Sequence, residues 1–136
     1  MRELASEAVA EAVAHLVVEA NVRLGEDVLA ALSDAREREE SPVGRDILGQ
    51  LLENARIARE DEVPVCQDTG YAIFFVELGQ EVHLIGGTLE EALNEGVRRG
   101  YTEGYLRKSI VGDPLVRVNT GDNTPAVIHV RLVPGD

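Results

Sequence analysis

Apolar residues recur every three or four positions along three stretches of the first 60 residues, which is the spacing of an amphipathic helix. The first stretch covers residues 4–20, and the second covers residues 26–38. The third begins at Ser41-Pro42, where Ser41 is suited to cap the helix and Pro42 to occupy its first turn, and it extends to about residue 58. The pattern therefore predicts an N-terminal half made of helices.

The periodicity changes to that of strands in the second half. Residues 72–78 form a β-branched and aromatic run, and Gly79-Gln80 is expected to turn it into a short partner strand at 82–85. Residues 126–133 alternate between an apolar and a mixed face. We predict an α+β fold, with N-terminal helices followed by a mixed strand–helix–strand half with a small sheet, in a single domain of residues 1–136.

A fourth helix separates these strands. Thr88 and Glu91 have the spacing of a capping box, and the helix that they open is expected to continue towards Tyr105. Three glycines follow one another on one face of this helix at four-residue spacing: Gly96, Gly100 and Gly104. Because glycine weakens a helix, the spacing predicts that another backbone packs closely against that face.

Charge and composition exclude several classes of function. A net charge of −12 over 136 residues disfavours nucleic-acid binding, which depends on clustered Lys and Arg. Apolar runs are too short to span a membrane, and the N-terminal pattern is helical with glutamates rather than that of a signal peptide, so we expect a cytoplasmic protein. Residues 98–118 are the exception to the acidity, with five bases against two acids, and they are where a small anion is expected to bind.

Cys66 is the only cysteine, so the chain forms no internal disulfide. A lone cysteine is commonly a buried core residue. Here it is followed by Gln67, Asp68, Thr69 and Gly70, which favour a turn, so we expect an accessible thiol that meets a substrate or a metal. The three histidines are scattered in the sequence, which argues against a zinc site and against a thiol hydrolase. The polar segment 119–126 is either an elaborated loop or a binding edge.

Three strings carry a resemblance to a known family. PVCQDTG at 64–70, GVRRGYTEGYLRKSIVGDPL at 96–115 and RVNTGDNTPAVIH at 117–129 resemble, in this order and spacing, the front part of the iron–sulfur hydro-lyases of the class I fumarase and L-tartrate dehydratase family. The resemblance extends over essentially the whole chain. It implies a fumarate hydratase, with L-tartrate dehydratase as the nearest alternative.

The resemblance also implies a cofactor and a set of site residues. Enzymes of this family bind a [4Fe–4S] cluster through three cysteines and act on a C4 dicarboxylate. Cys66 matches the first cluster ligand, Gln67 and Asp68 match neighbours of the cluster and substrate, and Arg107 matches the base that clamps a substrate carboxylate. Asp68 and Arg107 are the implied catalytic residues. Arg107 is expected near the end of the fourth helix, where the alternative role is that of a cation stabilising the helix C-terminus.

The chain departs from the family pattern in its ligand count. Two further cysteines and a Gly-rich segment have no counterpart in it. We therefore expect the N-terminal domain of an α subunit, inactive and without a cluster by itself. Its expected partners are the remaining α-subunit segment, a β subunit or domain, and further copies in a homo-oligomer. The alternative from another class is a non-catalytic acidic interaction module, in which Cys66 is incidental.

Overall fold

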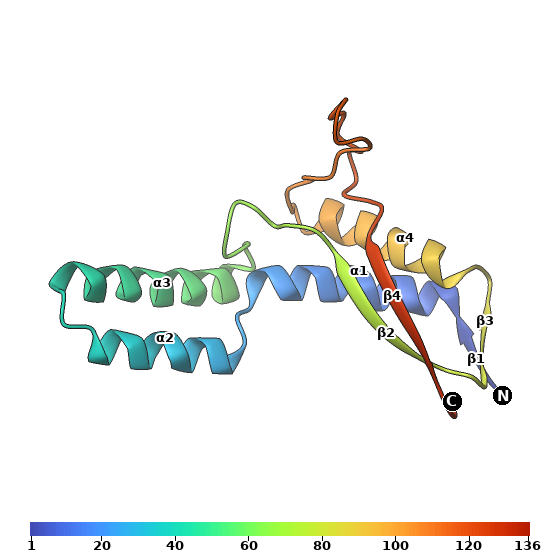
Figure 1. The fold of residues 1–136 in the computed structure, drawn as a ribbon, viewed down its shortest axis with the longest axis horizontal. Coiled ribbons are helices and arrows are strands. Elements are labelled where there is room, and N and C mark those ends of the chain that lie inside the picture. Colours follow the sequence, from blue (N-terminus) through green and yellow to red (C-terminus); the bar gives the residue numbers. More distant parts are fainter. The chain divides into compact units, whose positions relative to one another are not determined.

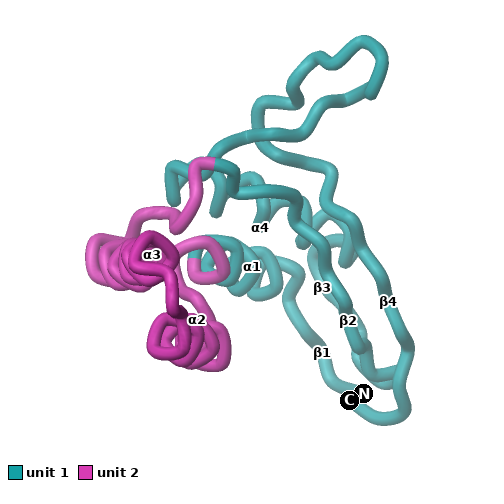
Figure 2. The backbone as a smooth tube through the Cα atoms, turned by 60° about the vertical axis from the view of Figure 1, so that its left-hand side comes forward, with its two compact units in different colours: residues 1–18, 68–136 teal, residues 19–67 magenta.

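A computed structural model describes all residues from Met1 to Asp136. It contains four helices and four strands in the order β1, α1, α2, α3, β2, β3, α4, β4 (Figure 1), which confirms the predicted α+β class. The chain divides into two compact units, one of residues 19–67 and one of residues 1–18 and 68–136 (Figure 2). No helix is long and apolar enough to cross a bilayer.

The unit of residues 19–67 is built on two helices, α2 (Glu26–Arg38) and α3 (Pro42–Asp61), which lie side by side (Figures 1 and 2). At the start of α3, the Gly44 N–H donates to the Ser41 hydroxyl at 3.3 Å, and Pro42 is the first helical residue. The predicted cap is therefore confirmed. An Arg59–Glu26 ion pair of 2.8 Å joins the two helices.

The other unit contains two separate two-stranded sheets, both parallel. Strand β1 (Arg2–Ala5) pairs with β3 (Val82–Ile85), and β2 (Ile73–Gly79) pairs with β4 (Val127–Val133). The predicted strands at 72–78, 82–85 and 126–133 are present. The first helix, α1, runs from Ser6 to Val22 and not from residue 4, because residues 2–5 extend to pair with β3.

The expected hairpin between β2 and β3 does not form. A two-residue hairpin turn of the favoured type I′ needs a positive φ at both central residues, and neither Gln80 nor Glu81 has one. Instead, both residues remain hydrogen-bonded to the chain at the end of β4. The Gln80 N–H donates to Val133 O at 2.9 Å, and the Glu81 N–H donates to Gly135 O at 3.0 Å. The chain then enters β3, which pairs with β1, and the Arg2 N–H donates to Glu81 O at 2.9 Å.

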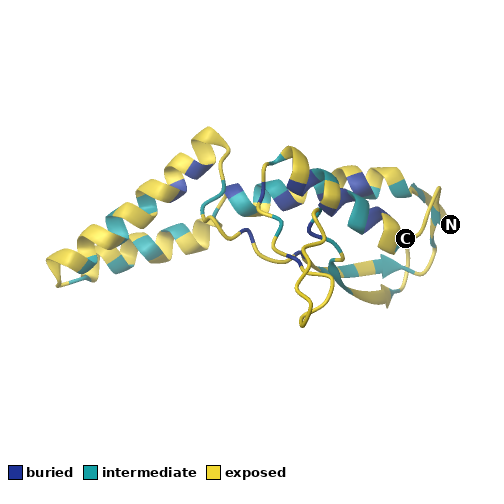
Figure 3. Ribbon diagram, turned by 90° about the horizontal axis from the view of Figure 1, so that it is seen from above, coloured by how far each residue is buried: buried dark blue, intermediate teal, exposed yellow.

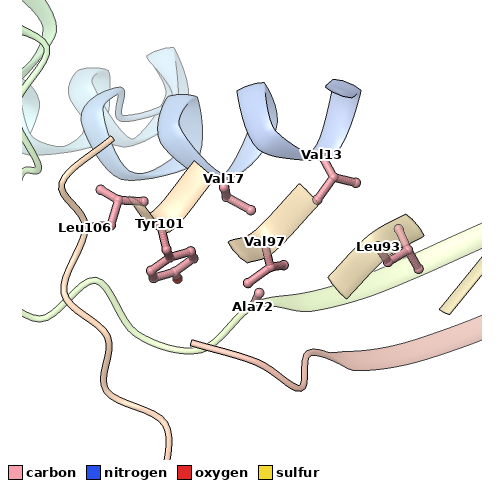
Figure 4. Packing of buried hydrophobic residues seen from close by; sticks show 7 residues of the cluster. All are labelled: Val13, Val17, Ala72, Leu93, Val97, Tyr101 and Leu106. Atoms are coloured by element: carbon pink, nitrogen blue, oxygen red, sulfur yellow. The ribbon is translucent and has the colours of Figure 1, made fainter. Parts of the chain in front are cut away.

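The core of this unit lies between α1, α4 (Leu89–Glu103) and the β2·β4 sheet. Figure 3 shows the buried positions concentrated on α1 and α4. Seven buried residues form the central cluster (Figure 4): Val13, Val17, Ala72, Leu93, Val97, Tyr101 and Leu106. Tyr101 is the one aromatic residue of this cluster. It is 2% exposed, and its hydroxyl donates to Thr69 O at 2.9 Å.

The glycine face of α4 packs directly against α1. A Cβ added at Gly96 would lie 2.6 Å from Ala10 O, and one added at Gly100 would lie 2.6 Å from Ala14 O. One added at Gly104 would lie 2.6 Å from Val18 Cγ2. Real Cβ atoms do not approach other atoms this closely, so the close backbone packing predicted from the glycine spacing is confirmed. The capping box is also present, with Thr88 and Glu91 bonded reciprocally.

Candidate functional site

The turn that carries the cysteine follows α3. Helix α3 ends at Asp61; its C-cap residue, Glu62, takes a left-handed conformation, and Pro64 prevents the helix from continuing. Cys66 and Gln67 are exposed and are the last residues of the helical unit. Their polar sequence neighbours would be costly to bury without partners. The prediction of an accessible thiol is therefore confirmed.

Asp68 is the first residue of the other unit, and its side chain shapes the turn. Its carboxylate Oδ1 accepts the Gly70 N–H at 3.0 Å, and Gly70 has a φ of +68°, which glycine adopts without strain. The Asp68 side chain is exposed. One oxygen of this carboxylate thus orders the backbone, while the other is available to a ligand.

Thr69 ties this turn to the segment that contains Arg107. Thr69 is 8% exposed, and its hydroxyl donates to Arg107 O at 3.0 Å. Its own carbonyl accepts the Tyr101 hydroxyl from α4. The residue after Asp68 is therefore bonded to the backbone of Arg107, which brings two of the predicted site residues into neighbouring segments of one unit.

The sequence pattern placed Arg107 near the end of α4, but the structure places it outside the helix. The helix ends at Glu103, because Tyr105 takes a φ of +53° and the Leu106 N–H bonds back to Tyr101 O at 3.1 Å. This turn buries Leu106, at 2% exposure, and directs the next residue out of the helix. Arg107 is exposed and four residues beyond the helix, so a role as a cation at the helix C-terminus does not fit its position.

The bases of residues 98–118 divide into paired and unpaired groups. Arg98 forms ion pairs with Glu95 and with Asp122, the latter at 3.0 Å. Arg99 bonds Glu7 at 2.5 Å and Glu95 at 2.7 Å, and its hydrogen bond lowers the pKa of both carboxyls. By contrast, no acid pairs with the remaining three bases of the window: Arg107, Lys108 and Arg117. Arg107 is thus a cation with its full hydrogen-bonding capacity free.

The polar segment 119–126 is an elaborated loop that folds back onto the chain after Arg107. Asn119 pairs with Val111 in an isolated antiparallel bridge, and its side-chain amide donates to Lys108 O at 2.8 Å. Further along, Asn123 is completely buried, and its side chain is hydrogen-bonded to Gly70, in the segment after Asp68, and to Ser109, in the segment after Arg107. Thr69 and Asn123 were not among the predicted site residues. Their position within the PVCQDTG and RVNTGDNTPAVIH strings was the only available signal.

The candidate metal ligands do not form a site within this chain. No group of three or more His, Cys, Asp or Glu side chains is close enough to hold a metal ion. His83 and His129 are exposed on strands, and His129 stacks on Phe75 with ring centroids 5.0 Å apart. One exposed thiol fits the contribution of a single ligand to a cluster, and it does not fit a cluster held by this chain alone.

Comparison with known proteins places the chain in a family. The family model described as "Fumarate hydratase (Fumerase)" matches residues 10–136. The chain is 37% identical to the putative L(+)-tartrate dehydratase subunit alpha of Methanocaldococcus jannaschii over 88% of this chain and 43% of that protein. It is 32% identical to the L(+)-tartrate dehydratase subunit alpha of Escherichia coli K12, over 84% of this chain and 37% of that subunit.

A third relative is a fumarate hydratase. The chain is 45% identical to the anaerobic class I fumarate hydratase of Escherichia coli K12 over 64% of this chain and 16% of that enzyme. It thus spans less than half the length of each of these three relatives. Since the family model matches nearly all of the sequence, the chain belongs to the fumarate hydratase family.

Proposed function

We propose that this chain is the N-terminal domain of an iron–sulfur hydro-lyase that adds water to, or removes it from, a C4 dicarboxylate. Fumarate, hydrated reversibly to L-malate, is the first candidate substrate. The observation that carries the proposal is the unpaired Arg107, whose backbone is bonded to the residue following Asp68. A free guanidinium and an exposed carboxylate on two segments that are bonded together suit a dianionic hydroxy-acid, which needs one group to bind it and another to exchange a proton.

Arg107 is proposed to bind a substrate carboxylate. A guanidinium presents two parallel N–H donors to a carboxylate, and the charge-assisted bonds that result fix both distance and orientation. No ion pair competes for Arg107, so binding the substrate breaks no existing bond of this side chain. In a chain of net charge −12, an unpaired base is also what draws a dianion to the site.

Asp68 and Gln67 are proposed to act on the same substrate. The Asp68 carboxylate holds the turn with one oxygen, and the other oxygen is free to hold or transfer a proton of the substrate. Gln67, exposed beside it, offers an amide that donates to or accepts from a hydroxyl or carboxylate group. These roles make Asp68 and Arg107 the catalytic residues, with Gln67 assisting in binding.

Cys66 is proposed as one ligand of a [4Fe–4S] cluster completed outside this chain. Such a cluster supplies a Lewis acid at an iron that no protein residue ligates. The other ligands would come from the remaining α-subunit segment, and the complete enzyme is proposed to include a β subunit or domain and to form a homo-oligomer. The isolated chain is accordingly proposed to be inactive and to hold no stable cluster.

L-Tartrate is the second candidate substrate, and a specific observation favours it. The two tartrate dehydratase relatives match 88% and 84% of this chain, whereas the match with the anaerobic fumarate hydratase covers 64%. Tartrate carries a second hydroxyl, so an enzyme shaped for fumarate and malate would discriminate against it by the contacts that surround this group.

The test uses the enzyme assembled around this chain, reconstituted anaerobically with iron and sulfide. Fumarate hydration and L-tartrate dehydration are assayed side by side, with iron and sulfide content measured on the same samples. We expect Cys66→Ser to lower both the cluster content and the activity, and Asp68→Asn to lower the activity with the cluster retained. Native cluster content and turnover in Cys66→Ser would refute the proposed ligand, and absence of both activities in the native loaded enzyme would favour the acidic interaction module.

A further inference from the structure

The side chain of Asn123 is the most completely buried polar group of the chain. It is 0% exposed and takes a left-handed backbone conformation with a φ of +63°, although it belongs to a loop. A buried amide must have its donors and acceptors satisfied, and a loop residue is ordinarily on the surface. Its interior position therefore calls for an explanation in terms of its partners.

The partners of Asn123 come from the two segments that carry the proposed catalytic residues. Its Oδ1 accepts the N–H groups of Ser109 and Ile110, at 2.7 and 3.2 Å. Its Nδ2 donates to Gly70 O at 3.2 Å. The amide orientation follows from these contacts, because a flipped amide would set its NH₂ group against two donors.

We propose that Asn123 is a positioning residue that sets the separation between Asp68 and Arg107. This inference rests on the function proposed above. Gly70 lies two residues after Asp68, and Ser109 lies two residues after Arg107, so one side chain clamps both segments close to their functional residues. The Thr69 hydroxyl bond to Arg107 O forms a second tie between the same two segments.

Two ties in succession restrain the segments more than either does alone. The Thr69–Arg107 bond by itself leaves the two segments free to pivot about one point. The Asn123 amide adds contacts at Gly70 and at Ser109–Ile110, on the far side of that point along both segments. A substrate bound between a guanidinium and a carboxylate needs both within about 0.5 Å of their productive positions, which is what such a paired restraint supplies.

The bonding pattern also argues against a general role in folding. All three hydrogen bonds of the Asn123 amide go to Gly70 and to residues 109–110, and none goes to a helix or strand. Asn94 makes a useful contrast. Its amide donates to Glu90 O within α4 and accepts the N–H of Ala126, the residue before β4, at 2.9 Å each, and so serves the scaffold.

The test compares Asn123→Gly with Asn94→Ala in the assembled enzyme. Glycine removes the amide and tolerates the positive φ, so it adds no backbone strain. We expect amide hydrogen exchange at Ser109 and Ile110 to be at least about tenfold faster in Asn123→Gly and unchanged in Asn94→Ala. We further expect kcat/KM for L-malate to fall at least about tenfold below that of Asn94→Ala, with KM raised and the cluster content native.

A second variant separates the two halves of the clamp. Asn123→Asp keeps an acceptor for Ser109 and Ile110, and when ionised it has no donor for Gly70 O. Positioning predicts protected amides at 109 and 110 together with a kcat/KM that stays below native. If a loop-ordering role were sufficient, this variant would have native kcat/KM, and the inference would be wrong.

The outcomes separate this inference from the function on which it rests. Unchanged exchange at Ser109 and Ile110 in Asn123→Gly would overturn the clamp whatever the activity. Faster exchange with the kcat/KM of Asn94→Ala would overturn its role in positioning. If the native loaded enzyme turns over neither fumarate nor L-tartrate, the proposed function fails and the positioning role fails with it, while the exchange data still decide whether Asn123 holds the two segments together.

Discussion

Gly100→Ala should destabilise the protein, although alanine favours helices more than glycine does. In α4, Gly100 is buried against α1. A methyl group there would lie 2.6 Å from Ala14 O and 2.2 Å from Val17 Cγ2. Moving either neighbour costs free energy, because one is a helical carbonyl and the other is a β-branched side chain with one strongly preferred rotamer in a helix.

The magnitude follows from two opposing terms. Replacing glycine by alanine in a helix interior contributes about 1 kcal/mol of stability. Overpacking a well-packed interior costs about 1–3 kcal/mol, and two contacts well below van der Waals distance place Gly100→Ala at the upper end of that range. The net expectation is a loss of about 2 kcal/mol in the free energy of unfolding.

Gly49→Ala on α3 is the matched control. A Cβ at Gly49 would have the Arg36 guanidinium as its nearest neighbour, with Nε at 3.3 Å, and this is the far end of a flexible side chain. The side chain of Arg36 can move aside, so only the helix-propensity term remains. We expect Gly49→Ala to be neutral or to stabilise the protein by up to about 1 kcal/mol.

Urea unfolding followed by far-UV circular dichroism measures both variants against the native protein. The expected result is a lower midpoint for Gly100→Ala and an equal or higher one for Gly49→Ala. If Gly100→Ala is as stable as the native protein, α1 and α4 do not pack at the distance described. If both variants lose the same stability, the effect is not one of packing, and the reasoning fails.

Three further predictions concern the site and the cap of α4. Cys66 should react with a thiol reagent in the native protein at one equivalent per chain, since it is exposed; reaction only after denaturation would contradict this. Arg107→Ala should lower kcat/KM in the assembled enzyme at least about a hundredfold, roughly 2.7 kcal/mol, with little change in melting because no ion pair is lost; near-native kinetics with the cluster intact would remove it from the site. Thr88→Ala should cost about 1 kcal/mol, since the hydroxyl caps the Glu91 N–H at 3.2 Å. Hydrogen bonds from the Thr88 backbone and hydroxyl lower the pKa of Glu91. The stability that this carboxylate contributes is therefore present above its unfolded pKa of about 4.3 and is lost as pH falls through the lower folded value. A difference in stability between native and Thr88→Ala that does not shrink below about pH 4 would contradict this role of Glu91.

Several features of this protein were determined by the sequence alone, because their causes are local. The caps of α3 and α4 depend on residues three positions apart, so Ser41 and Thr88 identified both helix starts. The spacing of the glycines on α4 predicted a close neighbour, since a helix face without side chains is otherwise unfavourable. The polar residues after Cys66 likewise predicted its exposure. The functional family was also recognisable, from three strings in a fixed order.

Other features were decided only by the tertiary structure, because their partners are distant in the sequence. Residues 2–5 became a strand through pairing with β3, some 80 residues away, against a helical local pattern. The burial of Leu106 against the core ended α4 at Glu103 and placed Arg107 outside the helix. The Asn123 amide found its three partners at Gly70, Ser109 and Ile110, which no local periodicity encodes. A residue's type limits the bonds that it can form, and the fold decides which segments come within reach of them.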